Sequence, residues 1–221
     1  MKPSNRERQM ARIDRARRAQ IGRHRSARTR AKLIAAARGL YAARRIDQAT
    51  VDDVVAAAGV AKGTFYVHFE SLADLQSVIA DELARELDEL LQPRRLAVDD
   101  PVERIAAGCG AFIAQTLRNP AWGALVGHNA VAMPSVAAVA RKRLRDDVDH
   151  AARDGHLGSV PADLAFDFAT GIMLHIMLSA LQIRRSPKQA ADLVAGLLRA
   201  IGVAPNKAAT VAQRAIAREQ P

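Results

Sequence analysis

Residues 50–69 constrain the fold of this 221-residue chain more than any other stretch. The segment begins with a Thr–x–x–Asp pattern, in which Thr50 can cap a helix and Asp53 can return a hydrogen bond to the cap. Apolar residues follow at helical spacing up to Gly59, whose freedom to adopt positive φ suits a tight turn. The sequence therefore predicts two short helices joined by a tight turn.

The second of these helices is predicted to have two different sides. Phe65 and Phe69 are four residues apart, so both can face a core. The rest of the helix is small, polar and partly cationic, and its residues are Lys62, Gly63, Thr64, Tyr66, Val67 and His68. A face of this kind suits the major groove of DNA, which admits one α-helix.

The run G-V-A-K-G-T-F-Y-V-H-F resembles the helix-turn-helix of the TetR family of bacterial transcriptional regulators. The resemblance extends over roughly residues 27–75. It implies an all-α chain, with an N-terminal three-helix DNA-binding domain and a C-terminal helical domain for ligand binding and dimerisation. We expect DNA contacts from the helix-turn-helix and from the start of the preceding helix: Thr29, Arg30, Thr50, Lys62, Gly63, Thr64, Tyr66 and His68.

Four positions depart from the pattern of that family. Arg45 stands where relatives usually have a glycine, so this corner is expected to differ from theirs. Ala61 stands where a serine often caps the second helix, so the helix is expected to lack a side-chain cap. Val67 and Leu72 stand where relatives often carry Tyr and Lys that contact the DNA backbone. We therefore assign no phosphate contact to Val67 or Leu72.

The positive charge of the chain is concentrated at its N-terminus. The formal net charge is +10, and residues 1–30 hold 11 Lys and Arg against two acids. Residues 1–25 are expected to lack fixed structure when free. Two interpretations are open: an arm that lies on DNA phosphates or in the minor groove, or an inert solubilising tail.

The predicted domains follow from breaks in the helical pattern. Residues 26–91 form the DNA-binding domain, and residues 92–204 form the regulatory and dimerisation domain. Residues 205–221 are expected to form a polar, Ala-rich tail or a short final helix. Gln92 and Pro93 are expected to end the helix that begins near Leu72. A charged run at residues 141–149 is interpreted either as a solvated helix face or as a second DNA site.

Residues 162–184 are apolar almost all round, so a helix there must be covered on every side. Together with residues 187–201 it predicts a subunit interface, and similar helices in the TetR family pair with their symmetry mates. We therefore expect a homodimer. The candidate interface residues are Leu174, Leu178, Leu181, Leu193, Leu197 and Ile201.

A small-molecule pocket is expected in the second domain. His175 lies among apolar residues, either as a hydrogen-bonded core histidine or as the polar anchor of a ligand. The candidate pocket residues are Phe112, Trp122, Val126, Met133, Phe168, Ile172 and His175. Because charge is scarce among them, we expect an apolar or weakly polar effector.

The sequence offers no catalytic or metal-binding pattern. The six histidines are scattered, and no phosphate loop or nucleophile elbow is present, so neither an enzyme nor a cofactor is expected. A single cysteine, Cys109, excludes an internal disulfide and is interpreted as a core residue. Without a membrane span or secretory signal, the chain is expected in the cytoplasm, at the nucleoid.

These observations predict a ligand-responsive repressor that binds a pseudo-palindromic double-stranded DNA operator as a dimer. The alternatives are a transcriptional activator and a less specific DNA-coating protein driven by the basic arm. An enzyme is a third and weaker hypothesis.

Overall fold

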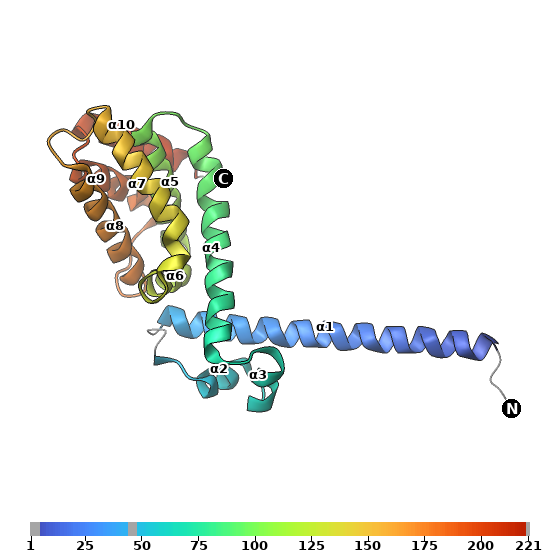
Figure 1. Cartoon of the computed structure of the whole chain (residues 1–221). Helices are drawn as coiled ribbons and strands as arrows, with labels where there is room; N and C mark the ends of the chain where they lie inside the picture. Colours follow the sequence, from blue (N-terminus) through green and yellow to red (C-terminus); the bar gives the residue numbers. More distant parts are fainter. Residues whose placement is uncertain (1–4, 44–47, 220–221) are drawn as a thin grey trace. The chain divides into compact units, whose positions relative to one another are not determined.

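The computed structural model describes residues 5–43 and 48–219, and these residues form helices joined by turns, with no strand among them. The predicted all-α fold is confirmed. The described chain divides into two compact units. One comprises Met1–Arg38 with Thr50–Leu75, and the other comprises Gly39–Ala49 with Gln76–Pro221. Figure 1 shows the order of the helices along the chain.

The first unit is a small three-helix domain. Its helices are α1 (Asn5–Ala43), which continues into the second unit, α2 (Val51–Ala58) and α3 (Lys62–His68), followed by the start of α4 (Leu72–Leu96). Its core consists of side chains with 9% exposure or less, which are Leu33, Ile34, Ala37, Val54, Val55, Phe65, Phe69 and Leu75. These residues have the spacing that the sequence predicted for core-facing helix sides.

Helix α1 is longer than expected. Residues 5–25 were expected to lack fixed structure, but they form one continuous helix with residues 26–43. The segment is rich in Arg, Ala and Gln, which are good helix formers, and it contains no proline after Pro3. Residues 1–4 lie outside the described part of the chain, and so does Arg45, where the sequence departs from the family pattern.

The second unit is a bundle in which α5 is central. Helix α5 packs against α6, α7, α8, α9 and α10. The bounds of the helices in this unit are α5 Pro101–Arg118, α6 Pro120–Ala132, η2 Pro134–Ala137, α7 Ala138–Arg153, α8 Ala162–Leu178, η3 Pro187–Gln189, α9 Ala190–Ala200 and α10 Pro205–Ala217. Side chains of Asp100 and Asn119 cap α5 and α6, and each of these helices begins with proline.

One predicted boundary in this unit is wrong. Helix α4 passes through Pro93 to Leu96, where the sequence predicted a stop at Gln92 and Pro93. Ion pairs of the next two residues, Arg94 with Glu219 and Arg95 with Asp147, hold this last turn in place.

For residues 205–221 the second expectation, a short final helix, is the one observed. Residues 205–217 form α10, which packs on α5 and α9. Its buried side is made of small and branched residues, Ala208, Val211, Ala212 and Ala215. The polar residues of this segment occupy the other side, so average polarity concealed an amphipathic helix.

No single described helix is both long and apolar enough to cross a membrane, although one pair, bent by 117° between α6 and the segment from Pro134 to Arg153, has the required length and composition.

Candidate nucleic-acid interface and small-molecule cavity

The start of α2 is fixed by a reciprocal cap. The backbone N–H of Asp53 donates to Thr50 Oγ1 at 3.2 Å, and the backbone N–H of Thr50 donates to Asp53 Oδ2 at 3.0 Å. The predicted capping box is therefore present. The Thr50 hydroxyl also donates to Asp53 Oδ2 at 2.7 Å, and Thr50 remains exposed at the end of the helix.

The turn after α2 depends on Gly59. Its φ of 65° lies in the left-handed region, which a glycine adopts without steric cost. The next residue, Val60, donates its backbone N–H to the carbonyl oxygen of Val55 at 3.1 Å, which closes the turn. Helix α3 then begins without a side-chain cap at Ala61, as the sequence predicted.

The two sides of α3 differ in exposure. Phe65 and Phe69 are 0% and 2% exposed, whereas Tyr66 and Val67 are 54% and 77% exposed. A Cβ atom added to Gly63 would meet nothing within 4 Å. Lys62 and Gly63 are also exposed, and Thr64 and His68 are half-buried. The predicted DNA-contacting residues of α3 therefore all lie outside the core of the domain.

One of these residues is held by an ion pair. Lys62 Nζ lies 2.9 Å from Asp52 Oδ1 on α2, and both side chains are largely exposed. The hydrogen bond and charge of Asp52 raise the pKa of Lys62 above its usual value. The ammonium group is therefore positively charged at the N-terminal end of α3.

The predicted contacts on α1 lie in the same unit. The Arg30 guanidinium is stacked over the ring of Phe69, with its Cζ 5.0 Å from the ring centroid. Thr29 Oγ1 donates to the carbonyl oxygen of Arg25 at 3.0 Å. Arg30 and Thr29 are both half-buried, and the stacking places Arg30 beside the residue that ends α3.

This geometry coincides with a match to a known family. The sequence model described as "Bacterial regulatory proteins, tetR family" matches residues 33–76, which include α2, the turn and α3. Residues 33–76 are a TetR-family DNA-binding domain. The resemblance inferred from the glycine turn and the α3 sequence is thus confirmed for this domain.

Most of the chain also shares its fold with solved structures, and one of them is described as a TetR family protein. RolR in complex with resorcinol matches with 26% identity and a TM-score of 0.59, covering 86% of this chain and 96% of that chain. A γ-butyrolactone receptor described as ArpA-like matches with 21% identity and a TM-score of 0.66, covering 89% and 100%. CprB from S. coelicolor A3(2) matches with 20% identity and a TM-score of 0.68, covering 87% and 98%. No curated protein matches the sequence of this chain.

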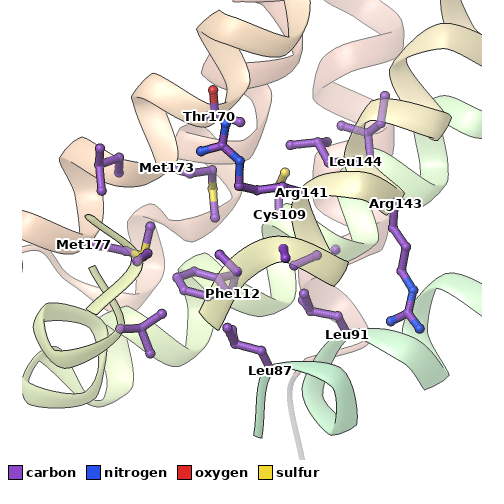
Figure 2. Close-up of a pocket in the computed structure, with 18 of the residues that line it drawn as sticks. Leu87, Leu91, Cys109, Phe112, Arg141, Arg143, Leu144, Thr170, Met173 and Met177 are labelled. Atoms are coloured by element: carbon purple, nitrogen blue, oxygen red, sulfur yellow. The ribbon is translucent and has the colours of Figure 1, made fainter. Parts of the chain in front are cut away.

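The second unit contains a cavity of about 740 Å³. Side chains from α4, α5, α6, α7 and α8 line it, and Figure 2 shows these side chains converging on one space. The apolar part of the wall includes Leu87, Leu91, Ile105, Phe112, Val126, Leu144, Met173 and Met177. The volume lies in the range of about 300–1,000 Å³ that is typical of small-molecule sites.

A buried cluster of charge forms part of the cavity wall. Asp147 Oδ2 accepts from Arg95 Nη2 at 2.6 Å, and Asp147 Oδ1 accepts from Arg104 Nε at 2.8 Å. The side chain of Asp147 is only 4% exposed. Two guanidinium groups therefore share one carboxylate, and the cluster carries one positive charge in excess.

Two further arginines on α7 line the cavity. Arg143 pairs with Asp88 on α4, whereas the Arg141 guanidinium lies 5.6 Å from the ring centroid of Phe166. The charged run at residues 141–149 was interpreted as a solvated face or a DNA site. In the structure the run does both: Lys142 and Asp146 form an exposed ion pair, whereas Arg141, Arg143 and Asp147 line the cavity wall.

The structure places the predicted pocket residues in different surroundings. Phe112 and Val126 line the cavity, whereas Trp122, Met133, Phe168, Ile172 and His175 are not among its lining residues. Trp122 packs against Phe112, with ring centroids 5.1 Å apart, and its Nε1–H donates to Glu86 Oε2 at 3.0 Å. Phe168 and His175 are exposed on α8.

The predicted interface residues also differ in exposure and location. Leu197 and Ile201 are 1% and 0% exposed within a single chain, so no second chain can contact them without repacking. Leu174 lines the cavity, Leu178 and Leu193 are half-buried, and Leu181 is 50% exposed. The exposed large apolar residues of α8 and of the segment that follows it are Leu164, Phe168, Leu181 and Ile183.

Cys109 also lines the cavity, but it is not reactive there. Burial, together with the charge of Asp147, raises the pKa of its thiol to about 12. The thiol is therefore neutral at physiological pH and acts as an apolar surface. Among the residues that the structure describes, no group of three or more His, Cys, Asp or Glu side chains could hold a metal ion.

Proposed function

We propose that this chain is a sequence-specific transcriptional regulator that binds a pseudo-palindromic operator as a homodimer and releases it when a small molecule binds. The observation that carries the proposal is the exposed side of α3, which presents Lys62, Gly63, Tyr66 and Val67 to solvent within a TetR-family domain. An α-helix with such a face fits the major groove of B-DNA.

The chemistry of this face favours particular DNA contacts. Lys62 can donate to guanine or to a phosphate, and the exposed Val67 side chain can contact a thymine methyl group. Gly63 allows the helix backbone to approach the base edges closely. Thr50 and the N-terminal backbone of α2 are suited to a phosphate, because helix N-termini attract anions.

A homodimer is supported by the apolar side of α8. Leu164 and Phe168 lie four residues apart, one helical turn, and are 48% and 44% exposed. The segment after α8 adds Leu181 and Ile183, which are about half exposed. Aligned apolar residues of this size mark a contact surface, and a two-fold dimer would bury them against the same residues of a second copy.

The response to a small molecule is supported by the cavity. RolR was solved with resorcinol and the ArpA-like protein is a γ-butyrolactone receptor, so similar folds accept organic effectors. An effector releases DNA only if it prefers the conformer that binds DNA poorly. Repression is the simplest consequence of a dimer that occupies promoter DNA, and activation is the alternative outcome.

The decisive experiment is selection of bound genomic fragments with the purified full chain, followed by competition with scrambled DNA. A specific regulator should enrich one palindromic sequence and prefer it over scrambled DNA by roughly 10³-fold or more. Equal affinity for both would instead favour the DNA-coating alternative, driven by the basic residues of α1. Such binding to chromosomal DNA also implies residence in the cytoplasm.

A further inference from the structure

The cavity of the second unit contains one arginine that differs from the others. Three of the four arginines in its wall have carboxylate partners, as described above. For the fourth, Arg141, no described carboxylate lies within 4.0 Å, and its guanidinium is stacked on the ring of Phe166. Figure 2 shows the Arg141 side chain extending towards Thr170 across the cavity wall.

The side chain next to Arg141, Thr170, has no free hydroxyl hydrogen to donate to a ligand. The Thr170 hydroxyl donates to the carbonyl oxygen of Phe166 in its own helix, at 2.9 Å. The hydrogen of that hydroxyl is therefore used. At this end of the cavity the guanidinium supplies the free N–H groups, and a guanidinium recognises a carboxylate through two parallel, charge-assisted hydrogen bonds.

Arg141 is also exposed, which matters for the cost of binding an anion. A carboxylate buried in an apolar interior would lose its hydration at high cost. At the rim, the carboxylate keeps part of its hydration shell while an apolar body enters between Phe112, Met173 and Leu91. A ligand with one charged end and one apolar end therefore matches the wall.

The remaining charges of the wall favour an anion over a cation. The buried cluster of Arg95, Arg104 and Asp147 has one positive charge in excess, and Arg143 is neutralised by Asp88. Asp167 is the other acid in the wall, and it offsets one positive charge in part from an exposed position. A neutral ligand would leave the excess positive charge uncompensated.

We propose that the cavity binds an organic monocarboxylate, with its apolar body against the α4, α5 and α8 walls and its carboxylate paired with Arg141. The inference rests on the proposed function only in identifying this cavity as the effector site. The sequence led us to expect an apolar or weakly polar effector. The structure-based proposal is more specific: the effector is a carboxylic acid with an apolar body.

The test compares acids with their matched alcohols by calorimetric titration of the full chain without DNA. One pair is decanoate and 1-decanol, and the other is 4-phenylbutanoate and 4-phenylbutanol, which separates a straight-chain body from an aromatic one. The measured quantity is the ratio of acid affinity to alcohol affinity. We expect at least one acid to bind. For that pair the acid should bind about ten times more tightly than the alcohol, or more, because one charge-assisted hydrogen bond contributes about this factor.

Two variants identify the residue responsible. Arg141→Gln should reduce the ratio about tenfold while leaving the affinity for the alcohol unchanged. Arg145→Gln is the matched control, because Arg145 stacks on the same Phe166 ring, with its Cζ 3.8 Å from the centroid, but does not line the cavity. It should leave the ratio within about twofold of that of the parent chain, because charges outside the site are screened.

The inference is overturned if neither acid binds, if acids and alcohols bind equally, or if both variants lower the ratio to the same extent. The last result would indicate that the acid responds to the general electrostatic field of the arginines and not to direct contact with Arg141. Acid binding that leaves operator affinity unchanged would support the inference and contradict the effector response of the proposed function. The carboxylate site is therefore tested by the ligand titration, and the effector response is tested separately by operator affinity.

Discussion

His128 Nδ1 lies 2.9 Å from the backbone carbonyl oxygen of Tyr41, so a side chain of α6 holds the C-terminal end of α1. A carbonyl oxygen only accepts hydrogen bonds, so Nδ1 carries the proton. Helix α6 also supplies Val126 and Ala130 to the cavity wall. Within the second unit, this hydrogen bond therefore joins a helix that lines the cavity to the C-terminal end of α1.

Removing this hydrogen bond should loosen the end of α1. We expect His128→Ala to lower the free energy of unfolding by about 1 kcal/mol and to speed hydrogen exchange in the last turn of α1. His175→Ala is a suitable control because His175 is exposed on α8. Similar exchange rates in the two variants would show that the bond contributes no local stability.

Gly63 should matter for DNA and not for folding. A Cβ atom at this position meets nothing within 4 Å, so Gly63→Leu should leave the melting temperature unchanged or slightly raised. The leucine would project towards the groove and should abolish specific operator binding, as measured by fluorescence anisotropy. Gly59→Ala should show the opposite pattern, with about 1 kcal/mol less stability, because φ is positive there. Unchanged operator affinity in Gly63→Leu would contradict the proposal that α3 enters the major groove.

The dimer should depend on the exposed side of α8. We expect Phe168→Glu to give monomers at micromolar concentration in analytical ultracentrifugation and to weaken operator binding. Leu96→Glu introduces the same charge at an exposed leucine of α4 and should leave the dimer intact. Leu197→Glu would not test the interface, because Leu197 is 1% exposed and the substitution would unfold the domain. A parent chain that sediments as a monomer would contradict the proposal.

The buried thiol predicts a loss of stability in alkaline solution. The pKa of Cys109 is raised from about 9 to about 12 in the folded chain. Between these values the unfolded chain loses the proton while the folded chain keeps it, so ionisation favours unfolding. Stability should therefore fall by up to ~1.4 kcal/mol per pH unit above about pH 9. Urea unfolding of the parent and of Cys109→Ala across this range should show the extra decline only in the parent.

The N-terminal part of α1 should contribute to DNA affinity through charge. Arg17, Arg23, Arg25 and Arg28 are exposed on this helix. If the segment makes three phosphate contacts per subunit, a chain beginning at Ser26 should show a log–log salt dependence flatter by roughly five units per dimer. Replacing the four arginines with Gln keeps the helix and should flatten the slope in the same direction. Equal slopes and affinities in all three chains would support the inert-tail interpretation.

The sequence by itself determined the DNA-binding domain in detail. The capping box joins residues three apart, the turn needs one glycine, and the buried side of α3 follows from two phenylalanines four apart. Each of these features depends on contacts within about one helical turn, and such contacts are set by local residue types. The same locality made the second unit predictable as a set of helices with prolines near their starts.

Only the tertiary structure decided what those helices face. Leu197 and Ile201 have the spacing of an interface, but α10 covers α9 within the same chain. Asp147 meets Arg95 and Arg104 across 52 and 43 residues, and this pairing leaves Arg141 as the wall arginine without a described carboxylate partner. Helical periodicity shows that one side is buried, but it carries no information about the partner, because packing between helices joins residues that are distant in sequence.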